Sequence, residues 1–217
     1  LVLAGALRAL APALSALGLA ALALLGQGVG PGKSVLAALP NIPTHIALAF
    51  GIWKTGACYV PVSNRAPQRN LMEICACVSP ALVITNRKKP DGYPGLSTAE
   101  LRTLCADCPA DMPPDVLAIP NLANCSGGTT GKTKVIEQDM PAGESDEGLR
   151  TWFAVSGMRF EMRQLLAGPL FHGAPHSAAF NGLYCGNTLV MPAKLDAETI
   201  VRLIKKYRIE YVQMVPT

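Results

Sequence analysis

Short apolar runs alternate with stretches of helical spacing along most of the chain. The apolar runs have the length and the Val, Ile and Leu content that are typical of buried strands. The predicted strands cover residues 33–39, 57–62, 81–85, 164–170, 188–191 and 209–215. The predicted helices cover residues 43–55, 68–78, 98–105, 176–185 and 196–207. This alternation predicts an α/β fold in which mostly parallel sheet layers are flanked by helices, with right-handed crossovers.

An uncharged apolar segment covers residues 9–25, near the start of the chain. Its length is close to that of a membrane span or of the apolar region of a signal peptide. However, the segment is rich in Ala, which contributes little to membrane insertion, and Pro12 interrupts it. We therefore predict a core-facing helix or helix pair in a soluble domain and no membrane span.

Length and charge limit the domain count and the partners. A chain of 217 residues allows one large domain or two small ones. The net charge is +4, but the basic residues are scattered and the first acidic residue is Glu73. Because the chain has no basic cluster, a nucleic acid is not expected as a partner. The chain starts at Leu1 and stops at Thr217 inside an apolar segment, so we interpret it as part of a longer protein.

The chain has seven cysteines, an odd number, and several of them lie inside apolar runs such as residues 56–60. This usage predicts buried free thiols in a reducing compartment, and hence a cytoplasmic protein. Cys105 and Cys108 have the spacing of half a zinc site. No second pair follows with the spacing of a zinc ribbon, so no metal ligands are predicted.

One loop carries far more chemical information than the rest of the chain. It runs Ser126-Gly127-Gly128-Thr129-Thr130-Gly131-Lys132-Thr133-Lys134. Its glycines let backbone N–H groups turn toward an anion, its hydroxyl groups add hydrogen-bond donors, and its two lysines add positive charge. This composition predicts a phosphate-binding loop.

The second half of a Walker A motif is present in the same loop as residues 131–133, but Ser126 stands where that motif requires its first Gly. A Walker loop opens a full helix, whereas the residues after this loop, 135–140, soon meet Pro141. Their Val-Ile start favours a strand. We therefore predict that the loop joins consecutive strands and that no long helix starts at Gly131.

The loop resembles the signature of the adenylate-forming superfamily, the acyl-CoA synthetases and their relatives, which runs Ser/Thr-Ser/Gly-Gly-Thr/Ser-Thr-Gly-x-Pro-Lys. Lys134 matches the lysine of that signature, while Thr133 replaces its usual Pro and Val135 the Gly that usually follows. Further blocks similar to those of the family, in its order and spacing, are residues 30–35, 39–41, 51–62, 168–172 and 214–217. The resemblance covers nearly the whole chain. It implies that residues 1–217 are the N-terminal portion of a large AMP-binding domain, whose remainder would follow Thr217 together with a small C-terminal domain.

The resemblance implies a reaction in two steps. A carboxylate attacks the α-phosphorus of ATP to give an acyl-adenylate and pyrophosphate, and coenzyme A then displaces AMP. The residues that would contact ATP are Ser126, Gly127, Gly128, Thr129, Thr130, Gly131 and Lys134. Lys134 would offset the charge of the leaving pyrophosphate. His172 matches a position beside the acyl and nucleotide pockets, where a neutral imidazole packs against a ring and does not act as a base.

The magnesium-binding Glu and the catalytic lysine of the family would lie beyond Thr217. The resemblance therefore assigns no catalytic residue to this chain, which is expected to be inactive alone. If more strands follow, the face formed by Ile209, Tyr211 and Val215 is either exposed or covered by a second copy in a homodimer.

The implied function is that of an ATP-dependent acid–thiol ligase, an acyl-CoA synthetase that acts on a small-molecule carboxylic acid. Residues 168–175 look most like bacterial fatty-acid, aryl-acid or bile-acid ligases, and they leave the acid unnamed. Two alternatives stay open: a peptide-synthetase adenylation domain that loads a carrier protein, and a non-catalytic nucleotide-binding module of Walker type. A native stop near residue 217 would favour the module.

Overall fold

A computed structural model of the chain describes residues 20–108, 113–114, 116–127, 133–139, 146–192 and 194–214. The described residues up to Asp139 belong to one compact unit, and those from Asp146 onward belong to a second. Each unit has its own sheet.

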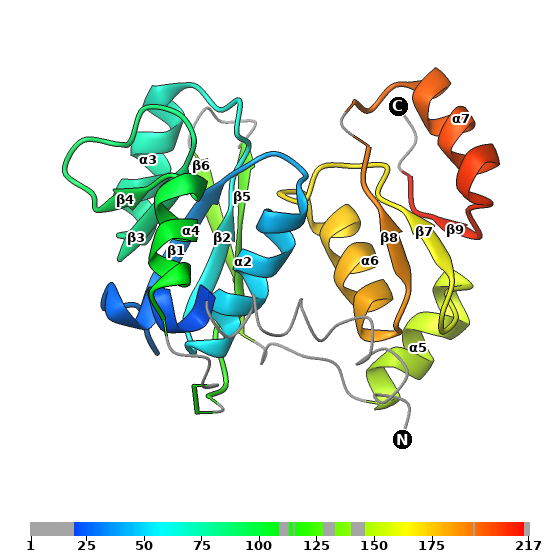
Figure 1. The fold of residues 1–217 in the computed structure, drawn as a ribbon, viewed down its shortest axis with the longest axis horizontal. Coiled ribbons are helices and arrows are strands. Elements are labelled where there is room, and N and C mark those ends of the chain that lie inside the picture. Colours follow the sequence, from blue (N-terminus) through cyan, green and yellow to red (C-terminus); the bar gives the residue numbers. More distant parts are fainter. Residues whose placement is uncertain are drawn as a thin grey trace. The chain divides into compact units, whose positions relative to one another are not determined.

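The first unit, blue to green in Figure 1, is built on a sheet of six described strands. These are β1 (Ser34–Ala38), β2 (Cys58–Pro61), β3 (Leu82–Thr85), β4 (Gly95–Leu96), β5 (Leu122–Gly127) and β6 (Thr133–Gln138). Their order is β4-β3-β1-β2-β5-β6, and every pair is parallel except β5 with β6. The helices are residues 20–26, α2 (Pro43–Lys54), α3 (Gln68–Val78) and α4 (Thr98–Ala106).

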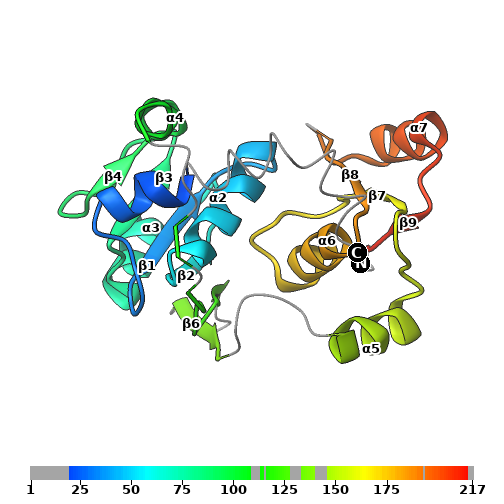
Figure 2. The ribbon, with the colours of Figure 1, turned by 60° about the horizontal axis from the view of Figure 1, so that its bottom comes forward.

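Both faces of this sheet are buried. On one face, Leu36, Val60 and Val83 pack in one apolar cluster with Leu71 and Ile74 of α3. The residues that alternate with them along the central strands point to the opposite face, and they are buried as well. Burial on both faces is what a parallel sheet between helices requires. The predicted α/β architecture is therefore confirmed (Figures 1 and 2).

The helix over residues 20–26 packs against α2. A Cβ atom added at Gly51 of α2 would lie 2.9 Å from the Cβ of Ala20, so only a glycine allows this approach. Trp53 of α2 stacks edge-on against Tyr59 of β2, with ring centroids 6.0 Å apart. The core-facing helix predicted within residues 9–25 is thus confirmed over its described part. Residues 9–19 lie outside the described residues.

The second unit, yellow-green to red in Figure 1, has a three-stranded parallel sheet among its described residues. Its strands are β7 (Arg163–Leu165), β8 (Thr188–Val190) and β9 (Tyr211–Val212), in the order β8-β7-β9. Its helices are α5 (Asp146–Ser156), α6 (Gly173–Tyr184) and α7 (Ala197–Tyr207). Searched across the described ranges of both units, no helix is long and apolar enough to cross a membrane.

All three strands of the second unit end earlier than predicted, β8 by only one residue. β7 ends at Leu165 instead of residue 170, because the chain turns before α6, where the His172 N–H donates to the Pro169 carbonyl at 3.1 Å. β9 covers only two residues of the predicted 209–215 and lies at the edge of the described sheet. Ile209 and Tyr211 are half-buried, and Val215 lies outside the described residues.

Two buried amide side chains link α6 to the sheet of the second unit. Gln164 of β7 donates from Nε2 to the Ala178 carbonyl at 2.7 Å. Asn187 accepts from the Met162 N–H at 2.8 Å and donates from Nδ2 to Gln164 Oε1 at 3.4 Å. Because each amide has partners, these polar groups are buried without a large desolvation cost.

The core of the first unit contains a buried histidine. The Nδ1 of His45 lies 3.1 Å from the Pro40 carbonyl oxygen, which can only accept, so Nδ1 carries the proton. The Nε2 atom of His45 then accepts from the Tyr59 hydroxyl at 2.5 Å. Burial lowers the pKa of His45 to about 4, although the bond to Pro40 opposes this shift. His45 is therefore neutral at physiological pH.

This burial predicts a loss of stability in mild acid. In the unfolded chain His45 binds a proton as the pH falls below about 6.5, whereas in the folded chain it stays neutral down to about 4. Protonation therefore favours unfolding across this window, and at pH 5 it lowers the free energy of unfolding by about 2 kcal/mol relative to pH 7.5. We expect the His45→Gln variant, measured by urea unfolding at both pH values, to lose this much of the difference. If the variant keeps the full difference between the two pH values, the assignment of the effect to His45 is wrong.

Candidate functional site

The phosphate-binding loop predicted from the sequence joins two adjacent antiparallel strands. β5 and β6 pair from Leu122 with Gln138 to Gly127 with Thr133. Only residues 128–132 separate these two strands. The chain after the loop is a strand, so the prediction that no long helix starts at Gly131 is confirmed. A Walker loop would be followed by a helix, and this loop is followed by strand β6.

The hairpin holds Lys134 close to the start of the loop. Cys125 and Val135 pack against the apolar cluster under α3. Because side chains alternate along a strand, Lys134 lies on the opposite face, where its side chain is exposed. In the ladder Lys134 pairs with Ser126, the first residue of the predicted loop. The backbone register therefore places one lysine beside the point where the loop begins.

The described residues include only part of the predicted site. The backbone of Ser126 and Gly127 forms the end of β5. Gly128, Thr129, Thr130 and Gly131 lie outside the described residues. Lys134 belongs to the first unit and His172 to the second.

His172 stands directly before α6 as its N-cap residue. Its side chain is exposed, and its ring centroid lies 4.5 Å from that of Phe171. The next histidine, His176, is instead buried against Phe180 with centroids 4.4 Å apart. Of these two histidines, His172 is the one that is open to a ligand.

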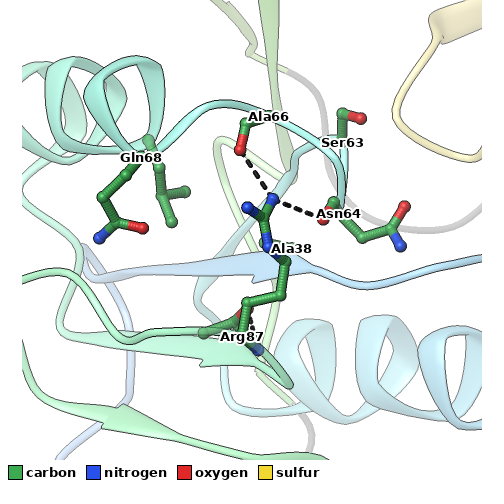
Figure 3. Close-up of a pocket in the computed structure, with 8 residues that line it drawn as sticks. Ala38, Ser63, Asn64, Ala66, Gln68 and Arg87 are labelled. Carbon is green, nitrogen blue, oxygen red and sulfur yellow. Dashed lines mark hydrogen bonds between the residues drawn. The ribbon is translucent and has the colours of Figure 1, made fainter.

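A second polar feature, which the sequence did not reveal, lies at the carboxyl ends of the parallel strands. Figure 3 shows a small pocket there that is open to solvent. Its interior has room for about one water molecule. Its lining residues come from the ends of β1 and β3, from the loop after β2 and from the start of α3: Ala38, Ser63, Asn64, Ala66, Gln68, Leu71, Thr85 and Arg87.

Arg87 is fixed at this pocket by the backbone. Its Nη1 donates to the carbonyl oxygens of Asn64 at 3.0 Å and Ala66 at 2.9 Å (Figure 3). Its own N–H donates to the Thr85 hydroxyl at 3.2 Å. The Nε2 atom of Gln68 is buried and has no partner among the described residues. Arg87 and Gln68 therefore both bring donor groups to this pocket.

The strand order explains why a pocket forms there. The chain runs from β1 to β2 on one side and then crosses to β3 on the other side of β1. The carboxyl ends of these three strands thus frame the point where the winding of the sheet reverses. Open α/β sheets bind ligands in the crevice at such a point.

Metal binding has no obvious site in the described part of the chain. Among those residues, no group of three or more His, Cys, Asp or Glu side chains could hold a metal ion. No magnesium ligand is therefore assigned among these side chains.

Comparison with known proteins identifies one family and several relatives. The family of AMP-binding enzymes matches residues 15–217. The pyochelin synthetase PchE of Pseudomonas aeruginosa is 30% identical over 175 residues, which are 78% of this chain and 12% of the synthetase. The 2-succinylbenzoate–CoA ligase of Bacillus pumilus is 33% identical over 97 residues, 42% of this chain and 18% of the ligase. The chain thus spans a small share of the length of these relatives.

Solved structures share the fold. The N-terminal domain of FACL13 from Mycobacterium tuberculosis superimposes with a TM-score of 0.80 at 23% identity, covering 95% of this chain and 55% of that one. The o-succinylbenzoate CoA synthetase MenE of Bacillus subtilis, solved with an acyl-adenylate intermediate, gives 0.77 at 17% identity, covering 93% and 54%. At these identities the likeness establishes the fold.

Proposed function

Because the chain belongs to the AMP-binding enzyme family, we propose that the protein containing it joins a carboxylic acid to coenzyme A at the expense of ATP. A carboxylate oxygen attacks the α-phosphorus of ATP and expels pyrophosphate, which leaves an acyl-adenylate. The thiol of coenzyme A then attacks the acyl carbon and expels AMP. The observation that carries this proposal is the β5–β6 hairpin, which offers a Gly/Thr-rich loop and an exposed lysine at one end of the sheet.

The loop and Lys134 act in the first step. Backbone N–H groups and hydroxyl groups of residues 126–131 hold the β- and γ-phosphates, and Lys134 stabilises the charge that develops as pyrophosphate leaves. A lysine on a paired strand suits this role, because the ladder fixes its backbone and little reorganisation is needed during the reaction. His172 offers an exposed ring surface to the acyl group and needs no proton transfer.

A simple assay tests this activity on the full-length protein. In the absence of a thiol, labelled pyrophosphate enters ATP only when the acyl-adenylate forms and then reacts back with pyrophosphate. We therefore expect the exchange to require a carboxylic acid. An exchange or hydrolysis of ATP that is independent of any acid would contradict the proposal.

The pocket at Arg87 favours coenzyme A as the acceptor. Coenzyme A carries a nucleotide with several phosphate groups, and a guanidinium fork is the side chain best suited to bind phosphate. Two backbone carbonyls hold the Arg87 fork in place before any ligand arrives. A carrier protein presents its thiol without this nucleotide, so it has no nucleotide phosphates that Arg87 could bind.

This assignment gives a prediction about the acceptor. We expect Arg87→Gln to raise the KM for coenzyme A by about 10- to 100-fold, the loss of one charged hydrogen bond, without slowing acid-dependent pyrophosphate exchange. Pantetheine, which lacks the nucleotide, should be a poor acceptor and should be insensitive to the change. Arg65→Gln is the matched control, since Arg65 is exposed in the loop after β2, between the pocket residues Asn64 and Ala66, but does not line the pocket. Equal losses with coenzyme A and pantetheine would contradict this role of Arg87.

A carrier protein is the second candidate acceptor, since nonribosomal peptide synthetases are among the relatives. Transfer of the acyl group to a carrier protein with no transfer to coenzyme A would favour it. We place the reaction in the cytoplasm, where ATP is supplied and where the free cysteines of the chain stay reduced.

A further inference from the structure

The end of α4 brings two cysteines onto a single turn. Cys105 lies in the last turn of the helix and Cys108 follows its C-cap residue, Asp107. The Cys108 N–H donates to the Cys105 carbonyl at 3.3 Å. This bond closes a four-residue turn, in which the first and last Cα atoms lie within about 7 Å. Disulfides usually span about 4.4–6.8 Å between Cα atoms, so this turn has suitable dimensions for one.

Contacts at both ends of α4 fix the helix that carries this turn. At the start of α4, Ser97 and Glu100 form a capping box, and Lys89 binds the Glu100 carboxylate at 2.9 Å. At the other end, the Cys108 thiol folds back and donates to the Leu104 carbonyl at 3.3 Å. The Cys108 sulfur therefore already lies over the last turn of α4, the turn that carries Cys105.

Accessibility distinguishes this pair from the three buried cysteines. Cys105 and Cys108 are both half-exposed thiols without a disulfide. Cys58, Cys75 and Cys185 are buried, and Cys77 is exposed. Cys125 is half-exposed like the pair, but it packs against the apolar cluster under α3 that contains the buried Cys75.

We propose that Cys105 and Cys108 form a redox-modifiable dithiol site, which a disulfide oxidant such as oxidised glutathione converts into an intramolecular disulfide. One cysteine thiolate attacks a sulfur of oxidised glutathione and expels one glutathione thiolate. The second cysteine attacks the resulting mixed disulfide and expels the other. One intramolecular disulfide and two reduced glutathione molecules result, so electrons and protons balance.

The site differs from rapid redox catalysts in its electrostatics. Burial raises the pKa of Cys105, and the neighbouring Cys108 raises it further. The helix end that carries the pair is also the negative end of its dipole, which disfavours a thiolate. Because only the thiolate attacks, oxidation is slow at neutral pH and speeds up by about tenfold for each pH unit below the thiol pKa. The same lack of thiolate stabilisation makes the disulfide, once formed, hard to reduce.

The sequence allows an unusually direct test. Asp107 lies between the two cysteines, so a protease that cleaves before Asp separates them unless a disulfide holds the fragments together. The reduced native protein is treated with oxidised glutathione, its remaining thiols are alkylated after unfolding, and the digest is analysed by mass spectrometry with and without a reductant. We expect a linked pair of fragments, one on each side of this bond, that separates on reduction. It should form about tenfold faster at pH 8 than at pH 7.

Three variants test whether Cys105 and Cys108 are the cysteines that form the linked pair. Cys105→Ser and Cys108→Ser should each abolish the linked pair and leave the remaining thiol as a mixed disulfide with glutathione. Cys77→Ser, which removes a more exposed cysteine, should leave the linked pair unchanged. Recovery of both native fragments separately, as alkylated or glutathione-bearing peptides, would overturn the proposal. A disulfide that joins Cys125 to Cys75 or Cys77 in preference to this pair would overturn it as well.

Discussion

Replacement of Lys134 by Met slows the acid-dependent exchange of pyrophosphate into ATP by about 30- to 1000-fold in the full-length protein. Met keeps the bulk of the side chain but removes the charge that offsets the leaving pyrophosphate. One charge-assisted contact in a phosphate site contributes about 2–4 kcal/mol to the stability of the transition state. Thermal stability should change little, because the Lys134 side chain is exposed.

Lys132 is the internal control for this experiment. The adenylate-forming signature leaves its position free, whereas a Walker motif would make it the lysine that binds phosphate. Lys132→Met should therefore be nearly neutral in the same assay. A severe loss in Lys132→Met together with a mild one in Lys134→Met would overturn the assignment of the loop.

The largest effect on stability is expected at Gly182 in α6. A Cβ atom added there would overlap Gln164 Oε1 and lie 3.2 Å from Asn187 Nδ2. Both of these amides are buried and hydrogen-bonded, so neither can move without losing a partner. We expect Gly182→Ala to lower the free energy of unfolding by about 2–3 kcal/mol, despite the better helix propensity of Ala.

Gly173, at the start of the same helix, provides the matched control. Nothing lies within 4 Å of a Cβ atom added at Gly173. Gly173→Ala should therefore stay within about 0.5 kcal/mol of the unchanged protein in guanidinium unfolding. If both variants unfold at the same denaturant concentration, the buried amide pair does not limit the space at Gly182.

The hydrophobic pattern was sufficient to predict most elements of both units. The helix predicted over residues 68–78 is found as α3 with the same bounds, because its apolar residues recur at helical spacing and face a buried sheet. β4 could not be predicted from a pattern, since only Gly95 and Leu96 form it and pairing with β3 defines it. The hydrophobic pattern also did not indicate α5, whose Trp152 and Phe153 follow a stretch rich in Gly and acidic residues.

The two parts of the candidate site differ in how far the sequence reveals them. The loop and Lys134 are contiguous, so their composition alone indicated phosphate chemistry. The pocket at Arg87 combines Ala38, Ser63 and Thr85, which lie far apart in the chain. They meet only because β1 lies between β3 and β2, and a list of strands does not give this order. The signal that could have located the pocket is the general preference for ligands at the carboxyl ends of parallel strands.

The fate of the carboxylate oxygen is the most direct test of whether a carboxylate attacks the α-phosphorus of ATP. The full-length protein is supplied with ATP, a thiol acceptor and an acid whose carboxylate oxygens carry a heavy isotope. Attack at the α-phosphorus predicts that one labelled oxygen appears in AMP and that pyrophosphate remains unlabelled. Label in inorganic phosphate, with ADP as the nucleotide product, would contradict the account, because the acid would then have been activated as an acyl phosphate.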